Sequence, residues 1–196
     1  LHADLIIGLP GEELASFAQS FNELATLAPH EIQVGVLKRL KGSPIIRHSD
    51  QFQMRYNPAP PYNILSNNLL DFQTIQRLNR FTRYWEMIAN SGRFPNTLPL
   101  ILGETPFERF IKLSDWLYET THQVHKIALK RLFELLHSGL THALALERTE
   151  VVSALTLDYE QSGIKGRPTF LQMGEHTPTN RKTEKDSRKA RQARHH

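Results

Sequence analysis

The chain of 196 residues contains no cysteine. It therefore cannot form a disulfide, and it cannot supply the thiolates that hold a structural zinc or an iron–sulfur cluster. It also lacks an apolar run of about 20 residues, the length that a membrane-spanning helix needs. These absences argue against a disulfide scaffold and a membrane protein. We expect a cytoplasmic protein that makes no contact with a membrane.

Positive charge is concentrated at one end of the chain. The formal net charge is +4, yet residues 180–196 alone hold seven basic and two acidic residues. The remaining chain is close to neutral, so its composition does not favour a folded nucleic-acid-binding domain. We expect residues 176–196 to form a disordered basic tail, which could contact nucleic acid weakly and nonspecifically.

The first 37 residues have the pattern of one βαβ unit. An apolar strand over 3–7 stops at Gly8, a Pro10-Gly11 turn follows, and residues 12–28 have the apolar spacing of an amphipathic helix. Residues 31–37 then alternate as a second strand. In α/β barrels the loops at the carboxyl ends of strands carry the ligand sites. The turn after the first strand is therefore the first candidate site.

A helical part is expected after the proline-rich residues 57–63. Helical spacing begins at Asp71, and further helices are predicted over 106–119, over 126–138 with Gly139 as the terminator, and over 142–157. Residues 120–125 are interpreted as a joint. The predicted division is an α/β part over 1–56, a helical domain over 57–162, and an irregular segment with the tail over 163–196.

A resemblance to a known family arises at the opening turn. Asp4-Leu5-Ile6-Ile7-Gly8-Leu9-Pro10-Gly11-Glu12 resembles a stretch of radical S-adenosylmethionine enzymes, in which it ends the fifth strand of a partial six-stranded barrel. The resemblance implies that the adenosine part of S-adenosylmethionine contacts five residues here: Ile6, Gly8, Leu9, Pro10 and Gly11. Glu12 falls one place later than the acid of the family pattern, so the resemblance gives it no polar role.

Two further segments resemble the same family. Residues 31–44, with Leu40-Lys41-Gly42-Ser43-Pro44, resemble the sixth barrel strand and its loop. Tyr56 to Tyr62 and the Arg80-Phe81-x-Arg83-Tyr84-Trp85 helix resemble the C-terminal helical extension of cobalamin-binding members, a domain of unknown function. The implied fold is the last βα units of a TIM-like barrel followed by a mostly α-helical domain, which we expect to cap the barrel mouth.

The implied parent enzyme cleaves S-adenosylmethionine reductively and modifies an unknown substrate by radical chemistry. Its 4Fe–4S cluster is held by a Cys-x-x-x-Cys-x-x-Cys motif that this chain lacks, and its cobalamin domain would also lie upstream. The expected partner is thus a missing N-terminal part of the same polypeptide. Without that part, this chain is not expected to be an active enzyme.

Lys38, Arg39 and Lys41 follow the second strand, on the rim where barrel ligands bind. They are candidate contacts for an anionic substrate. Phe81, Tyr84 and Trp85 could stack on a base, but aromatic residues at helical spacing usually form core.

Two Glu-x-x-His pairs, Glu119 with His122 and Glu134 with His137, suggest a di-iron site. The two further glutamates that such a site needs do not stand out, so no metal ligand is assigned.

Two alternatives remain. The chain could be a noncatalytic helical adaptor that binds RNA through Arg77, Arg80, Arg83 and the basic tail. It could also belong to a relative of the oxygen-independent coproporphyrinogen oxidases, which would share the barrel and lack the cobalamin domain.

Overall fold

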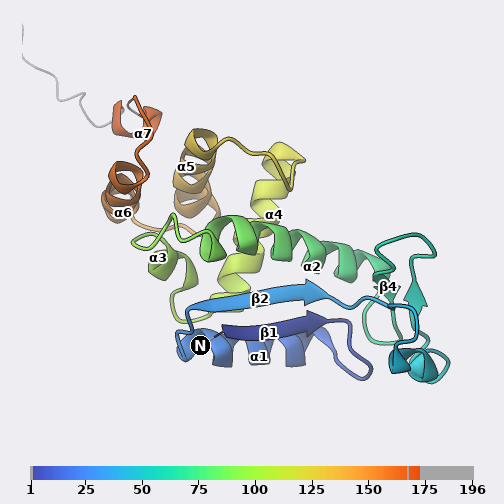
Figure 1. The fold of residues 1–196 in the computed structure, drawn as a ribbon. Coiled ribbons are helices and arrows are strands. Elements are labelled where there is room, and N and C mark those ends of the chain that lie inside the picture. Colours follow the sequence, from blue (N-terminus) through green and yellow to red (C-terminus); the bar gives the residue numbers. More distant parts are fainter. Residues whose placement is uncertain (1, 167, 173–196) are drawn as a thin grey trace, which may run out of the picture.

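The computed structural model describes residues 2–166 and 168–172 (Figure 1). The predicted basic tail lies outside this range. The elements follow one another in this order: β1 (His2–Ile7), α1 (Leu14–Thr26), β2 (Glu31–Val36), η1 (Pro44–His48), β3 (Arg55–Tyr56), β4 (Ile64–Ser66), α2 (Phe72–Trp85), η2 (Glu86–Asn90), α3 (Leu98–Leu102), α4 (Pro106–Thr121), α5 (Leu129–Ser138), η3 (Gly139–Ala143), α6 (Arg148–Gln161) and α7 (Thr169–Gln172). An α/β part followed by a helical part is confirmed. None of the described helices has the length and apolar character to cross a bilayer.

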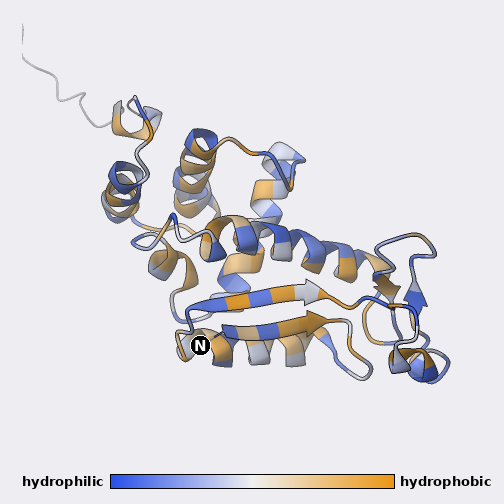
Figure 2. Ribbon diagram, viewed as in Figure 1, coloured by the Kyte–Doolittle hydropathy of each residue, from blue (hydrophilic) through white to orange (hydrophobic). Residues whose placement is uncertain are grey.

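The predicted βαβ unit is confirmed. β1 and β2 pair in parallel, with His2 opposite Glu31 and Ile7 opposite Val36, and α1 connects them. Because side chains alternate along a strand, the odd-numbered residues of β1 lie on one face with Ile32, Val34 and Val36 of β2. This face packs into the core, and α1 contributes the buried Phe17 and Phe21 to it. Figure 2 shows the alternation of hydrophilic and hydrophobic residues along β2.

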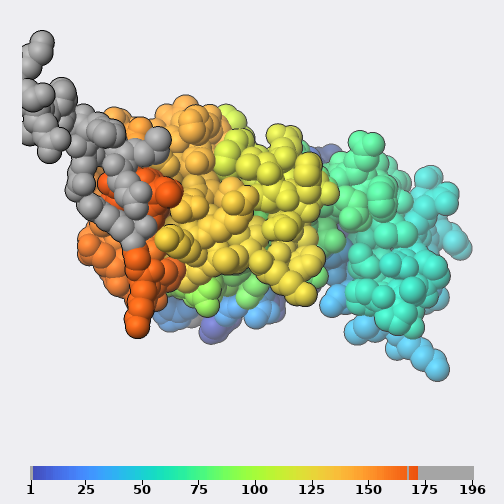
Figure 3. All heavy atoms as spheres, turned by 90° about the horizontal axis from the view of Figure 1, so that it is seen from above, coloured from blue at the N-terminus to red at the C-terminus, as the bar shows by residue number. Residues whose placement is uncertain are grey.

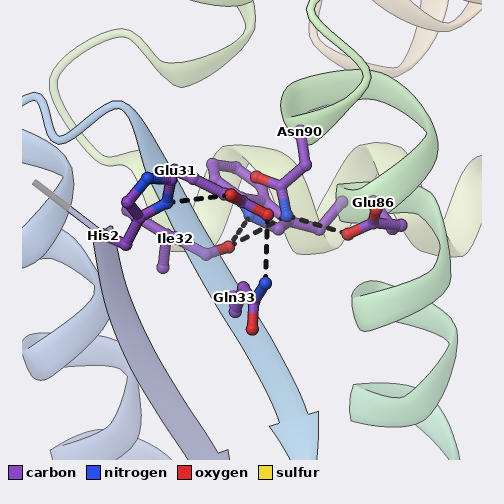
Figure 4. A network of polar contacts seen from close by, with 7 residues as sticks. His2, Glu31, Ile32, Gln33, Glu86 and Asn90 are labelled. Carbon is purple, nitrogen blue, oxygen red and sulfur yellow. Dashed lines mark hydrogen bonds and ion pairs between the residues drawn. The ribbon is translucent and has the colours of Figure 1, made fainter.

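The opposite face of the strand pair is polar and open. It carries His2, Asp4 and Ile6 of β1, which are all exposed, beside Glu31, Gln33 and Gly35 of β2. The Glu31 carboxylate lies 3.0 Å from His2 Nδ1 and accepts a hydrogen bond from Gln33 Nε2 at 3.3 Å (Figure 4). Parallel sheets are normally covered on both faces, so this bare face is unusual.

The two edges of the strand pair also differ. On the β2 side the Ile32 carbonyl accepts hydrogen bonds from Trp85 Nε1 at 2.7 Å and from Asn90 Nδ2 at 3.1 Å, so the end of α2 and η2 occupies this edge (Figure 4). On the β1 side no strand of the described residues pairs with the edge. A further strand could therefore join the sheet at β1 but not next to Ile32.

An aromatic cluster joins the βαβ unit to the helical part. Phe21 of α1 meets Phe81 and Trp85 of α2 edge-to-face, with ring centroids 5.1 and 4.8 Å apart. Phe107 and Phe110 of α4 pack on the same group. The prediction that Phe81, Tyr84 and Trp85 form core is confirmed, since these side chains are at most 4% exposed.

Several predicted boundaries are wrong. Gly139 does not end a helix, because α5 continues without a break into the π-helical turn η3. Glycine is needed there for packing: a Cβ on Gly139 would lie 2.7 Å from Leu113 Cδ1. The last predicted helix begins at Arg148 and not at residue 142. The segment after residue 162, expected to be irregular, contains the short helix α7 (Thr169–Gln172).

Asp158 anchors α6 to the segment before α3. Its side chain is fully buried, and its two oxygens accept four hydrogen bonds of 2.6–2.9 Å from the backbone and side chains of Asn96 and Thr97. A buried carboxylate is tolerated only when its oxygens are satisfied in this way. The sequence pattern did not indicate this buried carboxylate.

Replacement of Asp158 by alanine should lower the free energy of unfolding by about 3 kcal/mol, because four donors lose their buried acceptor at once. Urea unfolding followed by circular dichroism measures the loss. Glu160→Ala, an exposed change on the same helix, should stay within about 0.5 kcal/mol of the wild type. A similar loss in both variants would contradict the anchoring role.

Candidate functional site

The turn that follows β1 is shaped by two glycines. Gly8 and Gly11 have φ angles of +89° and +82°, values that side chains other than glycine rarely adopt. Gly8 is buried, and a Cβ placed on it would lie 2.8 Å from Ile64 Cγ2. Close packing on β4 therefore accounts for glycine at this position. A ligand ring cannot approach Gly8 from that side.

The other residues predicted to contact adenosine differ in exposure. Ile6 and Leu9 are each 38% exposed, Gly11 is exposed and Pro10 is half-buried. Ile6 lines a shallow depression of about 220 Å³ on the bare face, between Asp4 of β1, Gln33 and Gly35 of β2, and Glu86 of η2. Ile6 and Leu9 are thus the apolar groups of this set that a ligand can reach.

Gly35 was not predicted as part of the site. It lies opposite Ile6 in the strand register, and a Cβ on it would lie 3.7 Å from Ile6 Cδ1. Glycine in a strand often marks a place where something approaches the backbone closely. Its position in the Glu-Ile-Gln-Val-Gly-Val stretch was the signal that could have identified it.

Glu12 has a polar role that the resemblance did not give it. Its carboxylate faces the backbone N–H groups of Gly8 and Leu9, which favour its ionised form, so the side chain folds back over the turn. Burial raises the pKa of Glu12 above its usual value, and the two N–H groups offset only part of this rise. Its Oε2 atom is buried without a hydrogen-bond partner among the described residues.

The three basic residues after β2 do not converge. The Arg39 guanidinium lies 5.2 Å from the ring centroid of Tyr56, and Arg39 shares a cavity of about 640 Å³ with Lys41. Burial raises the pKa of Tyr56, and the charge of Arg39 opposes this rise. Lys38 lines a different cavity, beside Asn63 and Arg83.

The arginines of α2 have separate partners. Arg77 forms an ion pair with Asp115 of α4 at 2.7 Å. The Arg80 guanidinium lies 4.5 Å from the ring centroid of Tyr118, and Arg83 is exposed. The three residues therefore do not form one free basic surface.

The two Glu-x-x-His pairs lie on different helices. His122 follows the end of α4, whereas Glu134 and His137 belong to α5, where the His137 ring stacks on Phe170 and Glu134 accepts a hydrogen bond from Thr169. The described part of the chain holds no group of three or more potential metal ligands.

Fold and site together define a mixed α/β protein in which a parallel βαβ unit with one bare face is built onto a helical domain. The family model described as "Protein of unknown function (DUF4080)" matches residues 50–195, which is most of the chain. The chain therefore belongs to the DUF4080 family. No curated protein and no solved structure matches it.

Gly8→Ala tests the packing of the opening turn, with Gly42→Ala as the matched control. Both glycines have a φ near +80–90°, but a Cβ on Gly42 would have no atom within 4 Å. Gly42→Ala should cost about 1 kcal/mol of unfolding free energy for the left-handed backbone alone. Gly8→Ala should cost at least 1 kcal/mol more because Ile64 must also move. Equal losses in urea unfolding would argue against the Ile64 contact.

Glu12→Gln tests the strain of the buried carboxylate. Since the folded state raises the pKa of Glu12, folding favours the protonated form, and the ionised form destabilises the fold as the pH rises above the ordinary value of 4.5. The variant should therefore gain stability relative to the wild type between pH 4 and pH 7, as measured by urea unfolding at each pH. A stability difference that does not change with pH would exclude this effect.

Proposed function

We propose that this DUF4080 chain forms the last two βα units of a radical S-adenosylmethionine barrel, in an enzyme that also binds cobalamin. In this proposal β1 and β2 are the final strands, and the preceding strands come from the N-terminal part of the same polypeptide. The enzyme would generate a radical from S-adenosylmethionine and use it to modify a substrate whose identity the chain does not reveal.

The observation that carries the proposal is the one-sided exposure of the β1–β2 pair. A terminal strand pair in a larger parallel sheet has these three features: one bare face, an open edge at β1 and an occupied edge at β2. The exposed Ile6 and the glycine turn lie at the carboxyl end of β1, where α/β barrels bind their ligands.

The residues present fit the S-adenosylmethionine role in part. Ile6 and Leu9 offer apolar surface to the adenine ring, and Gly8, with Glu12 across the turn, holds the loop that presents them. S-adenosylmethionine bound there would supply the radical when an electron reaches it. The chain cannot hold the 4Fe–4S cluster that gives this electron, because it has no cysteine.

The position of residues 37–70 favours this segment, which includes the first residues of the predicted helical part, as the cover of the barrel mouth. In Figure 1 this segment, with η1, β3 and β4, lies beyond the carboxyl ends of β1 and β2, whereas α2 and α4 pack along β2 and α1. We therefore assign the covering of the barrel mouth to residues 37–70. The helical domain supports the sheet from outside.

The test uses the full-length gene product, purified without oxygen, reduced with dithionite and supplied with S-adenosylmethionine. It should contain an iron–sulfur cluster and release 5′-deoxyadenosine. Ile6→Asp should lower this release at least tenfold, because a charge would replace an apolar contact of about 1.5–3 kcal/mol.

Leu157→Asp is the matched control, since Leu157 is exposed on α6, a helix of the other part of the chain. It should leave 5′-deoxyadenosine formation unchanged. A gene product with no three-cysteine motif and no cluster would disprove the proposal. Unchanged release in a folded Ile6→Asp protein would remove the cofactor role of the turn.

A further inference from the structure

One face of α2 is polar, and its residues follow helical spacing. Gln76, Asn79, Arg80 and Arg83 occur at intervals of three and four, so they lie on one side of the helix. The apolar residues Leu78, Phe81 and Trp85 are buried on the other side. The proposed cofactor turn makes no use of this polar face.

Two cavities adjoin along this face. One, of about 520 Å³, lies between α2 and residues 118–125 and is lined by Gln76, Asn79, Arg80, Arg83, Tyr118, Val124 and His125. The other, of about 450 Å³, lies between α2 and β2 and includes Lys38, Asn63 and Thr82. Asn79 and Arg83 line both cavities, which are therefore neighbours on the surface of α2. We call the two cavities together the α2 cleft. In Figure 3 the yellow surface that includes residues 118–125 lies beside the green surface of α2.

Arg80 is held in position and has an unused donor. Its guanidinium lies 4.5 Å from the ring centroid of Tyr118, a contact that fixes the plane of the group. Its Nε atom is buried and has no hydrogen-bond partner among the described residues. Arg80 also lines the cavity, so its Nη groups are the donors left to meet a ligand there.

The wall opposite α2 is also held in place by α2. The Tyr84 hydroxyl donates a hydrogen bond of 2.7 Å to the Gln123 carbonyl, and Thr121 Oγ1 bonds to Leu117 O at 2.7 Å. These contacts fix the joint that carries Val124 and His125. The cleft is therefore a built feature of the fold and not a gap between loosely packed loops.

The charged residues that line the α2 cleft are all basic. Lys38, Arg80 and Arg83 line it, and no aspartate or glutamate is among the residues that line the two cavities of the described chain. The nearby Asp115 is already paired with Arg77. The lining also contains neutral amide and hydroxyl groups, which donate hydrogen bonds to oxygen anions. The rest of it is His125 and the nonpolar residues Val34, Gly35, Val36, Pro61 and Val124.

We propose that the α2 cleft binds the phosphate or diphosphate group of a small molecule. Arg80 and Arg83 would bind the phosphate oxygens through the Nη groups of their guanidinium side chains, in charge-assisted hydrogen bonds. The cavity volumes are in the range of small-molecule sites. An RNA strand is less well suited, because Phe81 and Trp85 are buried and Arg77 is paired with Asp115.

The test is calorimetric titration of the purified chain with inorganic pyrophosphate. Saturable binding at one site is expected. Arg83→Gln should weaken it about tenfold, since it removes one charged partner from an exposed position without disturbing a contact of the fold. Arg80→Gln should weaken it at least as much. The exposed Arg131→Gln on α5 is the control, because Arg131 lines neither cavity, so removal of the same charge there should leave the affinity unchanged.

Urea unfolding of each variant separates loss of binding from loss of fold, and Arg83→Gln keeps the test decisive if Arg80→Gln unfolds. Absence of saturable binding would overturn the proposal. Equal weakening by Arg131→Gln would also overturn it, as would an RNA oligonucleotide whose binding is weakened by Arg83→Gln and is not displaced by pyrophosphate. None of these outcomes depends on the cofactor turn, so the proposed radical chemistry and this site fail or succeed separately.

Discussion

The edge-to-face packing of Phe21 against Phe81 and Trp85 is the interaction on which the rest of the structure depends. A parallel pair of strands with a single helix buries too little apolar surface to be stable by itself. These rings extend the core from α1 into α2, and Phe110 extends it into α4. The βαβ unit and the helical part therefore share one hydrophobic core, and neither is expected to fold without the other.

Trp85 links this packing to the direction in which the sheet can grow. Its ring belongs to the aromatic cluster, while its Nε1 donates to the Ile32 carbonyl at the β2 edge. Trp85 thus joins the helical part to the sheet and occupies the free edge of β2. The bare face and the glycine turn remain accessible on the β1 side, which is the arrangement that the proposed cofactor role requires.

Local patterns in the sequence were enough to predict the βαβ unit, the buried stripe of α2, and two helices near residues 106–119 and 126–138 with a joint between them. They failed where distant residues decide the structure. Gly139 has the appearance of a helix terminator, but it is required by its contact with Leu113. The short strands β3 and β4 are defined by pairing across a loop, which no periodicity reveals. Around the candidate site, the glycine turn after the first strand could be predicted, whereas the inward turn of Glu12 and the place of Gly35 beside Ile6 depend on the three-dimensional register.

The open edge of β1 has a consequence for work with the chain in isolation. Unpaired N–H and C=O groups along a strand can template the addition of another strand, and natural proteins usually protect such edges with charge, bulges or a covering segment. Asp4 is the acidic residue of β1 itself. At high concentration the exposed strand offers a route to self-association between copies. Oligomers or aggregates of the isolated chain would then reflect this edge and not a native quaternary structure.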